Sequence, residues 1–302
     1  MPDLTSRPRP LSELSPERAR SVRGVLTDID DTLTRDGAIE PAALAALQTL
    51  REARMPVIAI TGRPMGWSEP FARDWPIDAI VAENGAVALF RDAAGQLQIE
   101  YAQDEATRTH NAMRLRRTAQ RVLDEVPGAT LAQDSAGRVT DIAIDHSEFA
   151  HLTQPQIDAV LQVMRSEGMN ATVSSIHING WYGEHDKLSG ARWIVQRLLG
   201  RSLDDETEAW AYVGDSTNDQ TMFGHFPVSV GVANLMQFAD RLHTWPAYLA
   251  QGERGRGFAE VTGALRAART ADKRPRPVNP AAPSAAPPAA SASTPGTPPA
   301  TH

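Results

Sequence analysis

Short apolar runs alternate with amphipathic segments along most of this chain. Apolar residues at helical spacing predict helices over 41–53 and 187–199, and a last helix is expected over 259–268. Runs rich in β-branched and aliphatic residues are expected as buried strands, and they span 22–27, 56–60, 79–82, 209–213 and 228–232. This alternation predicts an α/β fold with a Rossmann-like, doubly wound parallel sheet.

The middle third of the chain departs from that alternation. Turn-like residues between short β runs predict hairpins at 87–101 and 130–145, and β structure returns at 171–179. Helical patterns occupy 105–125 and 154–167. The pattern is typical of an α+β unit inserted into the α/β domain.

The expected organisation follows from these patterns and from proline content. Residues 275–302 hold nine prolines among Ala, Ser and Thr, a composition that predicts a disordered tail without its own core. The prolines near the start predict a flexible leader. The expected parts are the leader 1–20, a core domain formed by 21–86 and 181–270, an inserted domain 87–180, and the tail 271–302.

Composition excludes several classes of protein. The 302 residues include no cysteine, which excludes disulfide scaffolds, thiolate zinc sites, iron–sulfur clusters and a cysteine nucleophile. No apolar run is long enough for a membrane span, and the N-terminus lacks the apolar stretch of a secretory signal, so a cytoplasmic protein is expected. The net charge of −7 argues against nucleic-acid binding. It still permits a phosphorylated substrate, because a bound Mg²⁺ reverses the local field of an acidic site.

The segment GVLTDIDDTLT, residues 24–34, carries the strongest chemical signal. An apolar strand delivers Asp28 and Asp30, which are two residues apart and therefore point the same way, toward the carboxyl end of the sheet where open α/β folds bind ligands. Adjacent carboxylates repel each other unless a cation or a shared proton relieves them, which indicates a hard divalent cation. A DxD sequence alone is also typical of an ordinary acidic turn.

Three later segments add polar groups at predicted strand ends or helix starts. Thr61 and Gly62 follow the second core strand and offer a hydroxyl and an approachable amide to phosphoryl oxygens, although a plain turn has the same sequence. Lys187 opens a predicted helix, where it opposes the helix dipole; a solvated surface lysine is the alternative. The segment GDSTND, residues 214–219, follows another strand and supplies oxygen ligands for a cation.

Taken in order, DxDxT, TG, K and GDxxND resemble the haloacid dehalogenase (HAD) superfamily of aspartyl-phosphate phosphohydrolases. The resemblance covers about residues 22–265. The inserted unit resembles a C2-type cap. Its αββαββ pattern and the stretch ENGA at 83–86 are similar to the type IIB branch, which includes Cof-like, sucrose-phosphate, mannosyl-3-phosphoglycerate and phosphoglycolate phosphatases.

The resemblance implies a role for each motif carboxylate. Asp28 would be the nucleophile that is phosphorylated, and its carboxylate would also bind Mg²⁺. Asp30 would be the general acid/base, and its main-chain carbonyl would bind the same ion. Asp215 would be the third protein ligand of the metal.

The other motif residues would hold phosphate or support the metal site. By the same resemblance, Thr61, Gly62 and Lys187 would bind the phosphoryl oxygens, while Asn218 and Asp219 would support the metal ligands and orient the lysine or the nucleophile.

Further positions are candidates for substrate contact or depart from the family pattern. Arg63, Asn84 and His177 are candidate substrate contacts; for His177 the alternative is packing or a contact between domains. Asp31, just before Thr32, stands where the family often has glycine, so its carboxylate is expected to turn away from the phosphate.

The expected function is a Mg²⁺-dependent phosphatase, monomeric or homodimeric, acting on a small phosphorylated metabolite, either a sugar phosphate or a phosphoglycolate-like compound. A phosphomutase is an alternative, and it would need a cluster of cap arginines for a second phosphate. A non-catalytic binding protein with the same fold is the other alternative.

Overall fold

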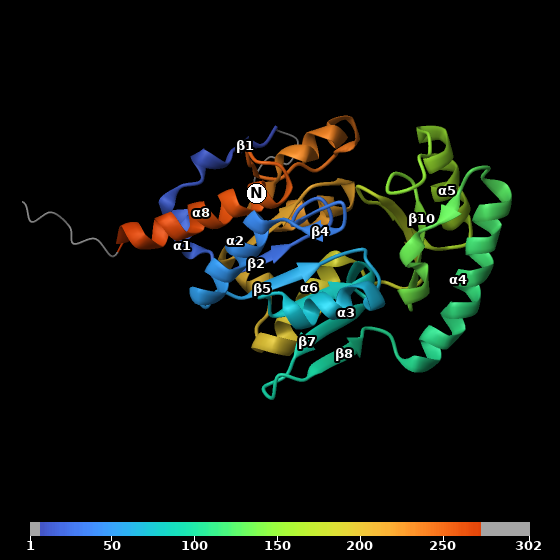
Figure 1. Cartoon of the computed structure of the whole chain (residues 1–302), viewed down its shortest axis with the longest axis horizontal. Helices are drawn as coiled ribbons and strands as arrows, with labels where there is room; N and C mark the ends of the chain where they lie inside the picture. The colour runs from blue at the N-terminus through green and yellow to red at the C-terminus, as the bar shows by residue number, and fades with distance from the viewer. Residues whose placement is uncertain (1–6, 273–302) are drawn as a thin grey trace, which may run out of the picture.

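The computed structural model describes residues 7–272 (Figure 1). Its main sheet has nine strands, with the order β1-β15-β14-β13-β2-β5-β6-β7-β8. The strands from β1 to β6 pair in parallel, whereas β7 and β8 are antiparallel. In sheet order their bounds are β1 Arg9–Pro10, β15 Tyr248–Leu249, β14 Val228–Gly231, β13 Trp210–Gly214, β2 Gly24–Thr27, β5 Val57–Ile60, β6 Ala79–Ala82, β7 Val87–Arg91 and β8 Leu97–Tyr101.

Helices cover both faces of this sheet, and successive strand residues point to opposite faces. In β2, Val25 belongs to one buried cluster and Leu26 to the other. Helices α1 (Pro16–Ser21), α2 (Pro41–Glu52), α3 (Met65–Asp74) and α8 (Arg254–Asp272) pack on the Val25 face. Helices α6 (Lys187–Leu199) and α7 (Gln220–His225) pack on the Leu26 face. The predicted doubly wound α/β fold is confirmed.

The inserted unit has its own antiparallel sheet and its own core. The sheet order is β11-β12-β10-β9, with bounds Asn170–Val173, His177–Trp181, Asp141–Asp145 and Thr130–Leu131. Two helices, α4 (Glu105–Glu125) and α5 (Gln154–Ser166), share a buried apolar cluster with one face of this sheet. Figure 1 shows α4 along the outer edge of the unit, away from the main sheet. We call this unit the cap.

The opposite face of the cap sheet is polar and turns toward the core domain. Ile142 and Ile144 of β10 enter the apolar cluster of the cap, so Asp141, which precedes Ile142, faces the other way. The buried carboxylate of Glu83 in the core domain accepts hydrogen bonds from the backbone N–H groups of Val139 and Thr140, 3.1 and 2.6 Å away. A buried polar contact therefore fixes the cap to the core.

Shorter elements complete the fold. A two-stranded ribbon of β3 (Thr34–Arg35) and β4 (Ala38–Ile39) follows the acidic motif. Short 3-10 helices span Leu11–Glu13, Glu83–Gly85, Gln133–Gly137, Asp204–Ala209, Thr217–Asp219 and Ala233–Arg241. Between residues 7 and 272, no helix combines the length and apolar character that crossing a membrane requires.

Two sequence expectations about organisation were wrong. The hairpin 87–101, expected at the start of the inserted domain 87–180, extends the main sheet instead, because β7 pairs antiparallel with β6 and is almost entirely buried. In the expected leader 1–20, residues 7–20 are packed, because Leu11 and Ala19 insert into the core and β1 pairs with β15. The β segment 171–179 consists of two paired strands. The expected tail lies outside the described residues, apart from the end of α8.

Candidate active site

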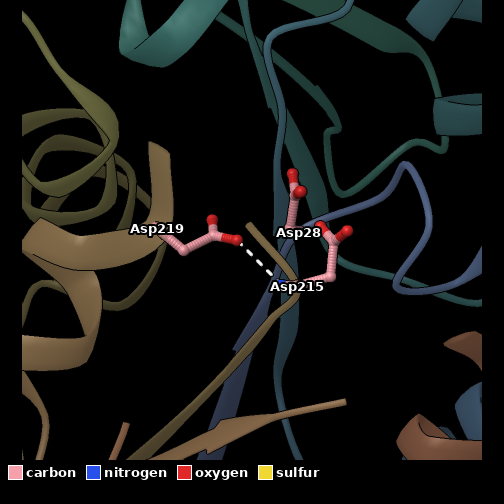
Figure 2. Close-up of side chains that lie close together, drawn as sticks. All are labelled: Asp28, Asp215 and Asp219. Carbon is pink, nitrogen blue, oxygen red and sulfur yellow. Dashed lines mark hydrogen bonds between the residues drawn. The ribbon is translucent and has the colours of Figure 1, made fainter. Parts of the chain in front are cut away.

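Two neighbouring strands of the main sheet end in acidic residues. Asp28 follows β2 and Asp215 follows β13, and these strands pair in parallel. The backbone N–H of Asp28 donates to the carbonyl of Val213, 2.9 Å away. Figure 2 shows the carboxylates of Asp28 and Asp215 beside each other, with Asp219 approaching from the following 3-10 turn. Oxygen atoms of all three lie within 4.8 Å of one another, at the point where strand order reverses.

Lys187, the first residue of α6, lies between two of these carboxylates. Its Nζ is 2.9 Å from Asp28 Oδ1 and 2.8 Å from Asp219 Oδ1. Although burial alone lowers the pKa of Lys187, the Asp219 and Asp28 carboxylates raise it above its usual range. The lysine is therefore a buried, fixed positive charge and not a solvated surface lysine.

Glycines allow α6 to approach closely enough to place this lysine. A Cβ on Gly190 would lie 2.6 Å from the Cα of Gly85, and one on Gly85 would lie 2.0 Å from the carbonyl oxygen of Asp186. Gly85 also has φ +110°, which side chains rarely adopt. The glycine after Asn84 is thus required by the packing of α6 on the turn that precedes the hairpin.

The carboxylate of Asp219 is occupied by protein donors. One oxygen accepts from Lys187 and from the hydroxyl of Tyr212, and the other accepts from the backbone N–H groups of Asp215 and Ser216 at 2.9 and 3.0 Å. Both oxygens are thereby used within the protein. Asp219 holds Lys187 and the Asp215 turn in place, which leaves Asp28 and Asp215 as the carboxylates available to a ligand.

Replacing Gly214 with Ala is expected to disturb this support. A Cβ at Gly214 would lie 2.5 Å from Asp219 Oδ2 and 2.6 Å from its Cγ, so Asp219 must move and release its hold on Lys187. We expect a lower melting temperature and a lower kcat. The matched control is Gly263→Ala at an exposed position of α8, where no atom outside the neighbouring helix backbone lies within 4 Å of the added Cβ and helix propensity predicts a gain of about 1 kcal/mol. If Gly214→Ala and Gly263→Ala had the same melting temperature and the same kcat, the proposed packing of Gly214 against Asp219 would be contradicted.

Asp30 lies on the cap side of this cluster and is paired with Arg63. The Arg63 Nε is 3.0 and 3.1 Å from the two oxygens of Asp30. Burial raises the pKa of Asp30 above its ordinary value, while Arg63 opposes the shift. The same guanidinium reaches two cap carboxylates, Asp134 at 3.1 Å and Glu148 at 2.7 Å. Arg63 therefore connects Asp30 with the cap.

Thr61 and Gly62 follow β5 at the same sheet edge. Thr61 is fully buried, and its hydroxyl oxygen accepts from the backbone N–H of Arg63 at 3.0 Å. The carbonyl of Gly62 accepts from Asn179 and Arg138 of the cap, and a Cβ at Gly62 would lie 3.1 Å from Asn179 Oδ1. The cap thus packs directly over the TG turn.

The structure brings the remaining sequence candidates near the site without placing them against its carboxylates. His177 Nε2 is 2.8 Å from Glu148 Oε2, so it reaches Asp30 only through Glu148 and Arg63. Asn84 donates to Asp141 at 3.5 Å. The side chain of Asn218 accepts from Ser216 at 2.9 Å. Asn84 and Asn218 line a cavity together with Lys187.

Sequence reasoning missed two residues around the acidic motif. Asn234 donates to Asp215 Oδ2 at 3.2 Å and to the carbonyl of Asp31 at 3.0 Å. Arg254 pairs with the Asp31 carboxylate at 2.6 Å. Asp31 has φ +54°, a conformation that favours glycine. Asn234 follows shortly after β14, and a polar residue at a parallel strand end was the signal available for it.

The donor set fits a hard divalent cation. Three buried carboxylates lie close together and two of them contact the single ammonium group of Lys187, so carboxylates outnumber cationic groups in this cluster. Burial raises the pKa of Asp28 to about 7, against the opposing effect of Lys187. Burial and the charges of Asp28 and Asp219 raise the pKa of Asp215 well above its ordinary value. A cation bound by carboxylate oxygens would relieve this repulsion.

Comparison with known proteins agrees with this architecture. Residues 25–123 match the family model described as haloacid dehalogenase-like hydrolase. A phosphoglycolate phosphatase from Methanothrix thermoacetophila is 27% identical over 250 residues, which cover 82% of this chain and 98% of that protein.

Solved structures share the fold at low sequence identity. The Synechocystis sucrose-phosphatase, in complex with sucrose and phosphate, is 17% identical with a TM-score of 0.57 over 81% of this chain and 98% of its own. The C-terminal domain of C. albicans trehalose-6-phosphate phosphatase is 15% identical, with a TM-score of 0.61. The match covers 87% of this chain and 99% of that domain. The solved structures therefore share the fold of this chain, and residues 25–123 are similar to the haloacid dehalogenase-like hydrolases.

Proposed function

We propose that this protein is a Mg²⁺-dependent phosphatase of the haloacid dehalogenase type that cleaves a small phosphorylated metabolite through a phosphorylated Asp28. The observation that carries the proposal is the buried contact between Lys187 and Asp28, with Asp215 and Asp219 beside it. A carboxylate beside a fixed cation supports the proposal, because transfer of an anionic phosphoryl group requires a nucleophile close to positive charge.

In the first step, a carboxylate oxygen of Asp28 attacks phosphorus. Lys187 holds Oδ1, which leaves Oδ2 to form the new bond. The bond between phosphorus and the ester oxygen breaks, and Asp30 protonates the departing alcohol. In the second step, water attacks phosphorus, Asp30 takes its proton, and the bond to Asp28 breaks to release inorganic phosphate. Dividing the hydrolysis in this way replaces one difficult step with two easier ones.

Asp30 needs a proton before the first step. Burial raises the pKa of its carboxyl, which favours the protonated acid, and Arg63 keeps both of its oxygens in place. General acid catalysis of this kind contributes about 10²–10⁴-fold.

The metal would be held by Asp28, Asp215 and the main-chain carbonyl of Asp30. When bound, Mg²⁺ would supply positive charge that offsets the negative charge of the phosphoryl group. Thr61, the Gly62 amide and Lys187 would hold the phosphoryl oxygens, since all three lie at the same sheet edge.

The cavity beside Asp30 favours a phosphatase over a phosphomutase. Its volume of about 340 Å³ suits a small metabolite. Among the described residues, its basic side chains are Arg63 and Arg254, both outside the cap. No cap arginine is among the described residues that line it, and two cap arginines are engaged elsewhere: Arg114 lies over the ring of Tyr182, and Arg138 is buried against Asp141.

Removing the metal is the direct test of this proposal. EDTA should abolish phosphate release from a panel of phosphorylated metabolites, and added Mg²⁺ should restore it, because the carboxylates otherwise repel the phosphoryl group. Mg²⁺ should also raise the melting temperature of the metal-free protein by binding the folded state. Full activity after exhaustive chelation would contradict the proposal.

A further inference from the structure

Two cavities of about 340 Å³ flank the catalytic cluster. One is lined by Lys187, Asn84 and Asn218; the other is lined by Asp30 and Arg63 of the core and by cap residues 147–149 and 175–176. In the proposed function Asp30 protonates the departing alcohol, so the alcohol must lie in the second cavity. We call it the leaving-group cavity, and the inference below rests on the proposed function in this respect.

Acidic groups outnumber basic groups in the leaving-group cavity. Its lining includes four carboxylates, those of Asp30, Asp31, Asp36 and Glu148. Its basic groups, among residues 7–272, are the two guanidinium groups of Arg63 and Arg254. An anionic leaving group would therefore meet a net negative lining, and like charges at such distances oppose binding.

Both guanidinium groups are already paired. Arg63 contacts Asp30 at 3.0 Å, Asp134 at 3.1 Å and Glu148 at 2.7 Å, so each of its three nitrogens faces a carboxylate. Arg254 contacts Asp31 at 2.6 Å. A substrate carboxylate would have to displace a protein carboxylate from one of these ion pairs.

The rest of the lining suits hydroxyl groups and an apolar ring face. The Oγ of Ser175 is buried and makes no hydrogen bond to the described residues, and Gln237 and Ser147 offer further donors and acceptors. Phe149 is 62% exposed at this cavity, an unusual position for a large aromatic ring. An aromatic face beside a hydroxyl-rich wall is a surface on which a sugar ring can stack.

We infer that the substrate is the phosphate ester of an uncharged, hydroxyl-rich alcohol, a sugar or polyol, and that esters with a carboxylate in the leaving group are poor substrates. Glu148 is the residue that enforces this selectivity, because it adds a negative charge to the cavity and also neutralises Arg63. Phe149 contributes binding to the ring of the substrate.

The test compares kcat/KM for a hexose phosphate, phosphoglycolate and phosphoethanolamine, with p-nitrophenyl phosphate as a general substrate. The hexose phosphate should exceed phosphoglycolate by on the order of tenfold to a hundredfold. A preference for phosphoglycolate or phosphoethanolamine would overturn the inference and leave the proposed phosphatase intact. Absence of phosphate release from every ester, with Mg²⁺ present, would instead refute the proposed function.

Matched variants separate the effect of charge from general damage. Glu148→Gln should raise the ratio of phosphoglycolate to hexose phosphate kcat/KM by about tenfold. Asp134→Asn also removes a carboxylate from Arg63, but Asp134 lies outside the cavity lining, so the ratio should stay near that of the wild type. Phe149→Ala should raise KM for the hexose phosphate and leave KM for phosphoglycolate unchanged. A Glu148→Gln ratio equal to that of Asp134→Asn would overturn the role of Glu148.

Discussion

Replacing Asp28 with Asn is expected to lower kcat by on the order of 10⁴- to 10⁶-fold, because the amide cannot act as the nucleophile. The fold should survive. The change is isosteric, and Lys187 keeps its contact with Asp219 at 2.8 Å. Phosphate release measures the activity, and circular dichroism with a thermal melt checks the fold.

The control for this variant is Asp31→Asn, three residues along the same loop. The Asp31 carboxylate pairs with Arg254 and does not contact Lys187, so this variant should keep measurable activity. An Asp28→Asn protein that hydrolyses substrate as fast as the Asp31→Asn protein would remove Asp28 from the mechanism.

Lys187→Met is expected to affect both stability and activity. It removes the positive charge between Asp28 and Asp219 while keeping a side chain of similar length. Loss of one partner from a buried ion pair costs about 3–5 kcal/mol of unfolding free energy. Loss of a group that stabilises transferring charge costs about 10²–10³-fold in kcat.

Arg192→Met on the same helix is the matched control. Arg192 forms an exposed ion pair with Asp204, 2.9 Å away, and exposed pairs contribute about 1 kcal/mol or less. Chemical denaturation and phosphate release measure the two effects. A Lys187→Met protein as stable and as active as Arg192→Met would show that the lysine is not part of the buried cluster.

Strong periodicity made the central elements predictable. The helices expected over 105–125 and 187–199 match α4 and α6, and the strand 79–82 matches β6. Several residues of the candidate site were predictable for a related reason: carboxyl ends of neighbouring parallel strands meet at one edge of the sheet, so Asp28 and Asp215 come together wherever their strands pair.

Local sequence patterns could not predict which segments pack or pair with each other when those segments are far apart in the sequence. Alternation and turn residues predicted the 87–101 hairpin, but not that its edge would join β6. Helix α3 was not predicted from the sequence, because Pro70 lies inside it and its apolar face is only partly buried. Near the N-terminus, the prolines predicted an unpacked segment, so the burial of Leu11 was not expected. That burial depends on packing against the core.

The same limitation applied to the site. Arg63 was a candidate substrate contact, yet its charge is satisfied by Asp30 and by two cap carboxylates that are far away in the sequence. Arg254 meets Asp31 across more than two hundred residues. Such ion pairs depend on how the cap and the last helix pack, which no local spacing encodes.

Trapping the phosphorylated enzyme tests the central claim most directly. Wild-type protein turning over a substrate with Mg²⁺ is quenched in acid and digested, and the peptides are analysed by mass spectrometry. The account predicts a phosphoryl group on the peptide that contains Asp28, and borohydride reduction of that acyl phosphate to homoserine at this position. Steady phosphate release with no modification at Asp28, or with the phosphoryl group on another residue, would contradict it.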